Sequence, residues 1–189
     1  MASNRHLGRI IALQTLYEHD FRVMSGDDSA DLGKILDRNI ARYQDTVDDT
    51  KFIRDIVEGV DKKLSEIDDT IRPLAPEWPV EQIARVDKVI LRIALHELLM
   101  SDDVPPKVVI NEAVELAKSF GGDNSSKFIN GVLGTAYRQK FGDEKPDKAK
   151  VKDKKPAKQT AKKAETKKPA AKKRSAKPKA KPKTTKKKD

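Results

Sequence analysis

The stretch VPPKVVINEAVELAKSFGGDNSSKFINGVLGTAY, residues 104–137, predicts two helices joined by a tight polar turn. Pro105 and Pro106 are disfavoured in a helix interior, so the first helix is expected to begin directly after them. Its apolar residues share one face at the spacing i, i+3, i+4, i+7: Ile110, Ala113, Val114 and Ala117. Gly121 and Gly122 are expected to end this helix, because glycine adopts a left-handed conformation without strain. The pattern favours an all-α fold.

The second helix of this stretch is expected to bury one face and to carry two glycines. The buried face consists of Ile129, Val132, Leu133 and Ala136. Asn124 or Ser125 offers a side-chain oxygen that can cap the helix. Gly131 and Gly134 lie inside it, and each costs about 1 kcal/mol relative to alanine. We therefore expect another backbone or a ligand to approach closely at these glycines.

The segment NEAVELAKSFGGDNSSKFINGVL, residues 111–133, closely resembles the NusB family of transcription antitermination proteins. The resemblance continues through VDKVILRIALHEL, residues 86–98, and weakly through ALQTLY, residues 12–17. It implies a compact, all-α bundle of about seven helices. It also implies a bacterial cytoplasmic protein that binds single-stranded boxA-like RNA together with the small-subunit ribosomal protein NusE. Such a protein would act on the transcription elongation complex, especially on ribosomal RNA operons.

The charge of the chain is distributed unevenly between two predicted parts, a helical domain over residues 1–142 and a tail over residues 143–189. Residues 145–189 contain 21 basic and 4 acidic residues, a net charge of +17, whereas the whole chain carries +10. Residues 1–144 are therefore acidic, with a net charge of −7. The tail is rich in Lys, Ala and Pro, and Val151 is its one larger aliphatic residue. We expect it to be disordered, because it cannot bury enough apolar surface to order itself.

The sequence offers no recognisable catalytic or metal-binding motif. The chain has no cysteine, which excludes a disulfide framework and thiol chemistry. His96 and Glu97 begin a possible HExxH motif, but Met100 stands where the second histidine would be required. His6 and His19 show no metal-ligand spacing with His96. No run of residues is apolar enough for a membrane span. We therefore expect a non-enzymatic protein without a cofactor, a metal ion or a membrane partner.

Apolar periodicity predicts further helices before the deciding stretch. One covers residues 5–24 and places Ile10, Leu13, Leu16, Tyr17, Phe21 and Met24 along one face. A short helix follows over residues 32–43, and a longer one runs from Thr50 to Ile71 over five turns. Residues 86–100 are the most apolar helix and are expected to lie at the centre of the bundle. Trp78, in a proline-rich connection, is expected to anchor that connection rather than to bind a ligand.

Two clusters form the predicted RNA site. The first comprises Arg5, His6, Arg9 and, further along, Gln14. Arg5 and Arg9 lie four residues apart, so they share a stripe that a phosphate chain can follow. Cations at a helix N-terminus oppose the helix dipole, and a local rule broken without visible compensation points to function. The alternative is a solvated charged face.

The second cluster is the turn of residues 123–128, with Asn124, Ser125, Lys127 and Phe128. Lys127 and the free amides of the following helix can bind phosphate, and Phe128 at the edge of the buried face can stack on a base. Asn124 stands where the family often has an acid, and a neutral amide does not repel phosphate. The alternative for Phe128 is a residue at the boundary of the core. The resemblance further implies a contact with NusE near Asp87, Arg85 and Tyr17.

Three functional hypotheses follow from the sequence. The first is a NusB-type antitermination factor that binds RNA. The second is a nucleoid-type protein that binds nucleic acids non-specifically through its tail. The third is an accessory domain of an enzyme, since some ribosomal RNA methyltransferases carry a NusB-like domain. The third is the weakest, because no catalytic domain follows residue 145.

Overall fold

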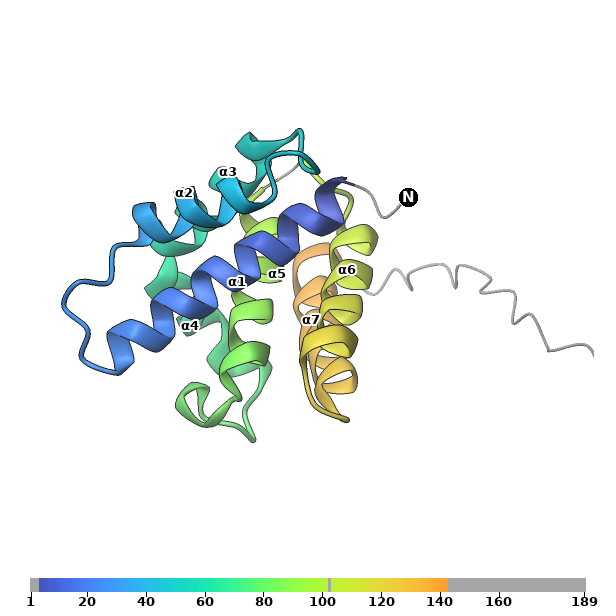
Figure 1. Cartoon of the computed structure of the whole chain (residues 1–189). Coiled ribbons are helices and arrows are strands. Elements are labelled where there is room, and N and C mark those ends of the chain that lie inside the picture. The colour runs from blue at the N-terminus through green and yellow to red at the C-terminus, as the bar shows by residue number, and fades with distance from the viewer. Residues whose placement is uncertain (1–3, 102, 143–189) are drawn as a thin grey trace, which may run out of the picture. The chain divides into compact units, whose positions relative to one another are not determined.

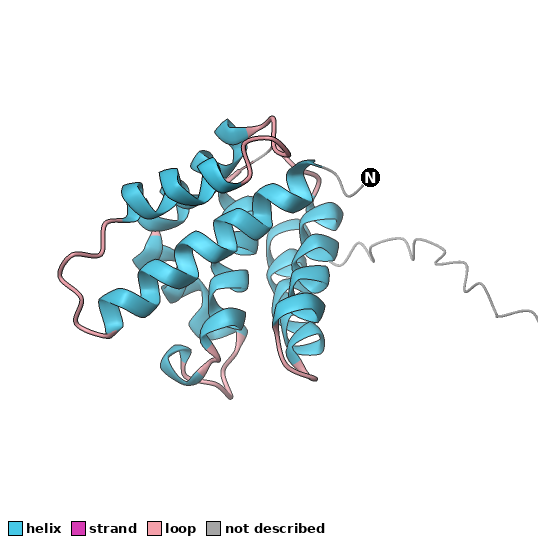
Figure 2. Cartoon of the chain, viewed as in Figure 1, coloured by secondary structure: helices cyan, strands magenta, loops and turns pink. Residues whose placement is uncertain are grey.

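The computed structural model describes residues 4–101 and 103–142, and within these ranges the secondary structure consists of helices joined by loops (Figures 1 and 2). The helices are α1 (Asn4–Met24), α2 (Leu32–Arg42), α3 (Thr50–Lys62), α4 (Leu64–Leu74), the 3₁₀ turn η1 (Val80–Gln82), α5 (Arg85–Met100), α6 (Pro106–Phe120) and α7 (Ser125–Phe141). The all-α prediction is confirmed. The predicted disordered tail, residues 143–189, lies outside the described residues.

Helix α5 lies at the centre of the bundle, as its apolar sequence predicts. It packs against α1, α3, α4, α6 and α7. Its buried residues surround the helix axis and include Val89, Ile90, Leu91, Ile93 and Leu95. In Figure 1, α1 crosses the bundle diagonally, and α6 and α7 run side by side next to it. A helix that is apolar on all sides needs neighbours on all sides, and α5 has them.

Several helix starts follow the expected local chemistry. Asp49 precedes α3, and its carboxylate accepts a hydrogen bond of 3.0 Å from the backbone amide of Phe52. Asp31 caps α2 in the same way through the amide of Lys34. Helix α6 begins at Pro106, where a missing amide hydrogen has no cost. Within α6, however, Val109 and Leu116 are buried in place of the predicted Ile110 and Val114.

The prediction of one long helix from Thr50 to Ile71 is wrong. The chain leaves the helical conformation at Lys63 (φ −112°, ψ 20°), so that α3 and α4 are separate helices. This bend allows α3 to pack against α1 while α4 packs against α5 and α7. Ile67 and Ile71 remain in the core. Neither a glycine nor a proline marks the bend in the sequence, and the apolar spacing continues through it.

The turn between α6 and α7 is tight for a different reason from the one expected. Gly121 has φ −90° and is not left-handed. A Cβ atom on Gly121 would lie 2.4 Å from Cβ of Ser125 and 2.7 Å from the carbonyl oxygen of Ala117. The glycine is therefore required by the close approach of the next helix rather than by its backbone angles.

Candidate nucleic-acid and protein interfaces

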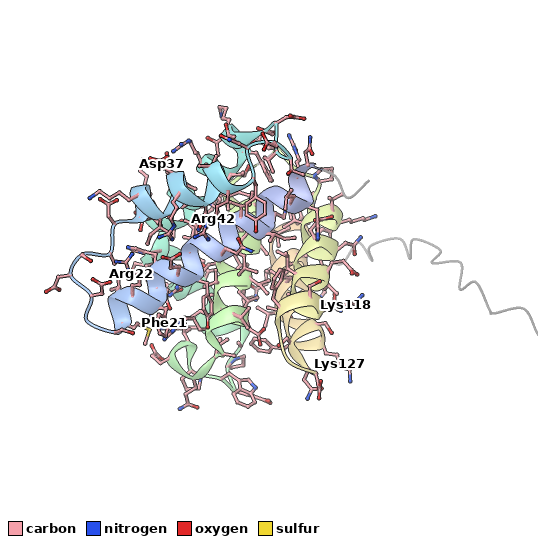
Figure 3. All side chains as sticks on the ribbon, viewed as in Figure 1. Phe21, Arg22, Asp37, Arg42, Lys118 and Lys127 are labelled. Carbon is pink, nitrogen blue, oxygen red and sulfur yellow. The ribbon has the colours of Figure 1, made fainter. Side chains whose placement is uncertain are left out.

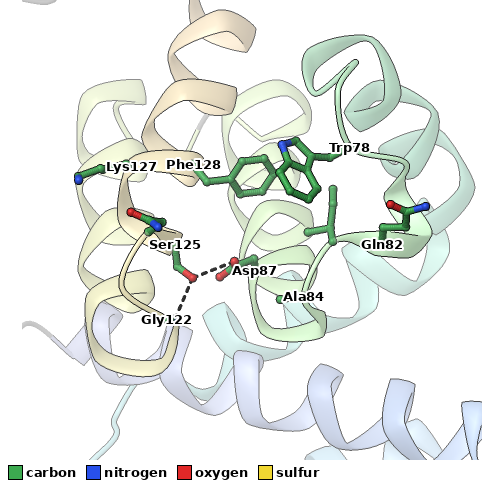
Figure 4. A pocket seen from close by; sticks show the side chains of 10 residues that line it. Trp78, Gln82, Ala84, Asp87, Gly122, Ser125, Lys127 and Phe128 are labelled. Atoms are coloured by element: carbon green, nitrogen blue, oxygen red, sulfur yellow. Dashed lines mark hydrogen bonds between the residues drawn. The ribbon is translucent and has the colours of Figure 1, made fainter.

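A cavity of about 650 Å³ opens between the α6–α7 turn, the start of α5 and the connection that precedes it. We call it the aromatic cavity, because Trp78 and Phe128 line it and their side chains point toward one another (Figure 4). Asn124 and Lys127 also line it. Figure 3 shows the side chain of Lys127 projecting outward from the end of the bundle. The cavity therefore combines two aromatic rings with a cation, the combination that binds single-stranded nucleic acid.

A buried carboxylate lies at the base of this cavity. Asp87 is 7% exposed, and its Oδ2 accepts a hydrogen bond of 2.8 Å from the hydroxyl of Ser125. The Ser125 hydroxyl in turn accepts one of 2.9 Å from the amide of Gly122. Burial raises the pKa of Asp87, and the bond from Ser125 opposes that shift. This chain of bonds fastens the turn to α5 (Figure 4).

These contacts change the roles expected for two residues. Ser125 is buried and its hydroxyl is bonded inside the protein, so it holds the turn in place at the lining of the aromatic cavity, and a contact with RNA stays a prediction. Asp87 is also buried and faces the turn that carries Phe128, so little of its carboxylate is exposed, and its contact with a partner stays a prediction. Both residues now belong to the scaffold of the aromatic cavity.

The start of α7 offers fewer free amides than the sequence suggests. The amide of Ser125 donates to the carbonyl of Gly122, and those of Lys127 and Phe128 donate to the carbonyl of Asn124, at 3.0–3.1 Å. Neither Asn124 nor Ser125 caps the helix through its side chain. A phosphate at this site would therefore meet the ammonium group of Lys127 and not these amides.

The N-terminal cluster differs most from expectation. Arg9 is 2% exposed, and its Nε and Nη2 donate to Oε2 and Oε1 of Glu97 at 2.9 and 2.7 Å. His6 lies 2.8 Å from a carboxylate oxygen of Glu112, which is also 3.5 Å from Arg9. Acids on α5 and α6 thus compensate the cations that seemed unmatched in the sequence. The prediction that Arg9 contacts phosphate is wrong, because a phosphate cannot reach it.

Arg5 remains on the surface, where its guanidinium lies 5.0 Å from the centre of the Phe52 ring. Arg5 and His6 lie at the N-terminal end of α1, near the first half of α6, whereas Lys127 lies at the opposite end of α6 (Figures 1 and 3). A helix of 15 residues is about 22 Å long. An RNA strand that contacted both clusters would therefore have to run along much of α6.

A second surface gathers exposed aromatic and aliphatic side chains on the C-terminal half of α1. The sequence placed Tyr17, Phe21 and Met24 on the same helix face as Leu13 and Leu16, but Phe21 is 50% and Met24 65% exposed, whereas the two leucines are buried. We call this surface the α1 aromatic face and define it as Tyr17, Phe21 and Met24, which recur at helical spacing. Exposed apolar side chains in such a group are typical of protein interfaces.

Arg85 joins the α1 aromatic face. Its guanidinium lies 5.0 Å from the centre of the Phe21 ring and 5.8 Å from that of Tyr17, and its Nε lies 3.1 Å from Asp20. The structure thus brings together Tyr17 and Arg85, two of the three residues expected to contact a partner. Gln14 lines a shallow hollow together with Tyr17 and so lies beside this face, not beside Arg5.

Among the described residues, no group of three metal-binding side chains is found, and none of the helices is long and apolar enough to cross a membrane.

The comparison with known families gives a clear result. Residues 6–138 match the family model for NusB. The chain belongs to the NusB family.

Relatives within the NusB family cover most of the helical part. The transcription antitermination protein NusB of Chloroflexus aggregans is 47% identical over 137 residues, which are 71% of this chain and 87% of that protein. The protein of the same name from Dehalococcoides mccartyi is 44% identical over 133 residues, 70% of this chain and 89% of that protein.

Solved structures support the same assignment. The structure of T. maritima NusB is 33% identical and superposes with a TM-score of 0.65 over 74% of this chain and 94% of that chain. The NusB fold is also shared with a crystal structure of NusB and NusE in complex with double-stranded RNA. That chain is 23% identical, with a TM-score of 0.64, over 74% of this chain and 99% of that one.

Trp78 is the residue that sequence analysis missed. It is 54% exposed and lines the aromatic cavity, although a role as a buried anchor was expected. Its position depends on η1 and on the start of α5, which turn the connection back toward α7 (Figure 4). The one available signal was the three prolines around it, Pro73, Pro76 and Pro79, because a rigid connection can hold an aromatic ring at the surface.

Proposed function

We propose that this protein is a non-enzymatic transcription antitermination factor of the bacterial cytoplasm that binds single-stranded, boxA-like RNA. In this proposal it acts with a NusE-like ribosomal protein on the transcription elongation complex, especially in ribosomal RNA operons. The relatives named above support antitermination as the role, and the protein of the same fold solved with NusE and double-stranded RNA supports a NusE-like protein and RNA as the classes of partner.

The observation that carries the RNA part is the aromatic cavity. Its walls are the rings of Trp78 and Phe128, and Lys127 stands at its rim. A base can stack on either ring, while its phosphate is neutralised by the lysine. Asp87 is buried and bonded to Ser125, so its charge is set back from the path of the phosphates. Arg5 and His6 would contact the strand further along α6.

The α1 aromatic face supports a separate site for the protein partner. Tyr17, Phe21 and Arg85 form a stacked group in which the guanidinium is already oriented by Asp20. Aromatic residues and arginine are the types that contribute most to protein interfaces. The partner and the RNA would thus occupy different surfaces of the same bundle.

Binding measurements with three nucleic acids test the proposal. BoxA-like RNA, a scrambled RNA of the same composition and duplex DNA are compared at near-physiological salt, with and without NusE. We expect boxA-like RNA to bind most tightly and NusE to increase its affinity. Equal affinity for all three ligands would favour the alternative, a nucleoid-type protein that binds through the +17 charge of residues 145–189.

The Phe128→Ala substitution tests the cavity itself. We expect it to weaken RNA binding by about 1–3 kcal/mol, the range for loss of one stacked base. Unfolding should change less, because Phe128 is only partly buried. Normal RNA affinity together with a much lower melting temperature would show that Phe128 serves the core and would remove it from the site.

A further inference from the structure

A second hollow adjoins the aromatic cavity and shares Trp78 and Phe128 with it. Its volume is about 350 Å³, and it extends along α7 over Gly131, Val132 and Thr135, with Pro76 opposite. We call it the α7 groove. Trp78, Lys127 and Phe128 line both the aromatic cavity and the α7 groove. The two rings therefore form a ridge between two adjoining hollows, and one lysine reaches both.

Gly131 lies in the α7 groove without an internal reason to be glycine. Apart from its two chain neighbours and the nearby backbone of α7, a Cβ atom there would meet no atom of the described residues within 4 Å. By contrast, a Cβ atom on Gly59 would lie 2.3 Å from the imidazole of His96, and one on Gly121 would lie 2.4 Å from Ser125. Glycine destabilises a helix interior relative to alanine, and at Gly131 no packing among residues 4–101 and 103–142 offsets that cost. The open space above Gly131 is thus suited to a molecule that approaches from outside.

We propose that the α7 groove binds the nucleotide adjacent to the one in the aromatic cavity. Two consecutive nucleotides of a single RNA strand would then lie on either side of the ridge formed by Trp78 and Phe128. This inference rests on the proposed RNA-binding function. It adds a second subsite and assigns Gly131 and Trp78 to it.

The charges and surfaces of the groove fit this occupant. Lys127 lines both hollows, so it stands where the phosphate that joins the two nucleotides would pass. Glu77 lines only the α7 groove and would repel a phosphate, which directs the backbone toward Lys127. Val132 and the α-carbon of Gly131 form the floor of the α7 groove. This floor is apolar and open, so the face of a base or a ribose can pack on it. Trp78 is exposed enough for a base to stack on its indole ring.

The test changes Gly131, which lines the α7 groove and does not line the aromatic cavity. Gly131→Gln places a long side chain in the groove, and Gly131→Ala adds one methyl group. Gly134→Gln is the matched control, because Gly134 lines neither hollow and a Cβ atom there would make only an ordinary contact of 3.6 Å. Thermal unfolding of each full-length variant confirms that it is folded.

We expect Gly131→Gln to weaken binding of boxA-like RNA about 5- to 150-fold, the factor that corresponds to one stacked base. Gly131→Ala should melt at a higher temperature than the wild type and still bind RNA less tightly, whereas Gly134→Gln should bind as the wild type does. Trp78 is the one tryptophan of the chain, so its fluorescence reports on the ridge directly. RNA should quench it in the wild type and much less in Gly131→Gln.

Three results would overturn the inference. If RNA binds the wild type and Gly131→Gln equally and Trp78 fluorescence does not respond, the groove is not a subsite, while the proposed function stands. If Gly131→Gln weakens binding of NusE and leaves RNA affinity unchanged, the occupant is a protein. If the wild type binds none of the RNAs, the proposed function fails and the second subsite fails with it.

Discussion

Replacing Glu97 by alanine would leave the guanidinium of Arg9 buried without its two-point partner. The side chains of Arg9 and Glu97 are 2% and 4% exposed, and both bonds between them are shorter than 3 Å. Breaking a buried ion pair by removing one partner costs about 3–5 kcal/mol. Glu112 lies 3.5 Å from Arg9 and compensates part of its charge, so we expect a loss near the lower limit, about 3 kcal/mol.

Urea and thermal unfolding of the full chain measure this loss. A loss of about 3 kcal/mol corresponds to a melting temperature roughly 6–12 °C lower for a protein of this size. Glu115→Ala, which breaks the exposed pair with Lys118, is the control and should change stability little. The double variant Arg9→Met, Glu97→Met should recover most of the loss, because apolar residues of similar volume can replace a buried pair. A Glu97→Ala variant as stable as the control would refute this account of Arg9.

Three further predictions concern the other surfaces. Phe21→Ser should weaken NusE binding by at least about 2 kcal/mol, and it should leave RNA affinity in the absence of NusE unchanged. If titration calorimetry finds no change in NusE binding, the α1 aromatic face is not the partner site. A carboxyl with a raised pKa binds protons more tightly in the folded state, so the contribution of Asp87 to stability should fall as the pH rises above its ordinary pKa of 3.8. Unfolding curves of Asp87→Asn across this range should lack that fall, and identical pH profiles would contradict the prediction. Truncation after Glu144 should weaken binding of all RNA and DNA at low salt. The preference for boxA-like RNA over scrambled RNA should remain. Loss of that preference would show that the tail recognises sequence.

Local patterns in the sequence predicted the helices but not every boundary or buried face. Asp49 precedes the start of α3, and Pro106 begins α6. The apolar spacing of α7 identified its buried residues correctly. The bend at Lys63 was missed, because no local residue marks it, while the packing that accompanies it is long-range: both helices contact α5, but only α3 packs on α1 and only α4 on α7. Periodicity also cannot distinguish an apolar helix face that packs inside the bundle from one that remains exposed. Phe21 was predicted to share a helix face with Leu13 and Leu16, yet it is half exposed and they are buried.

The candidate site was predictable where it depends on neighbours in sequence and not where it depends on distant ones. Lys127 and Phe128 share one turn of helix, and the structure places them together. Arg9 resembled a surface cation because its acid lies 88 positions further along the chain. Trp78 was misjudged for the same reason, since only the fold brings its connection beside α7.

The bond between Arg9 and Glu97 also has a consequence for synthesis. Translation adds about 5–20 residues per second, so α5 emerges from the ribosome roughly 4–18 s after α1. During that interval Arg9, on the inner surface of α1, has no Glu97 carboxylate with which to form an ion pair. We therefore expect α1 to remain hydrated until α5 arrives and the nascent chain to fold late. A fragment that ends at Ala84 should accordingly show no cooperative unfolding transition.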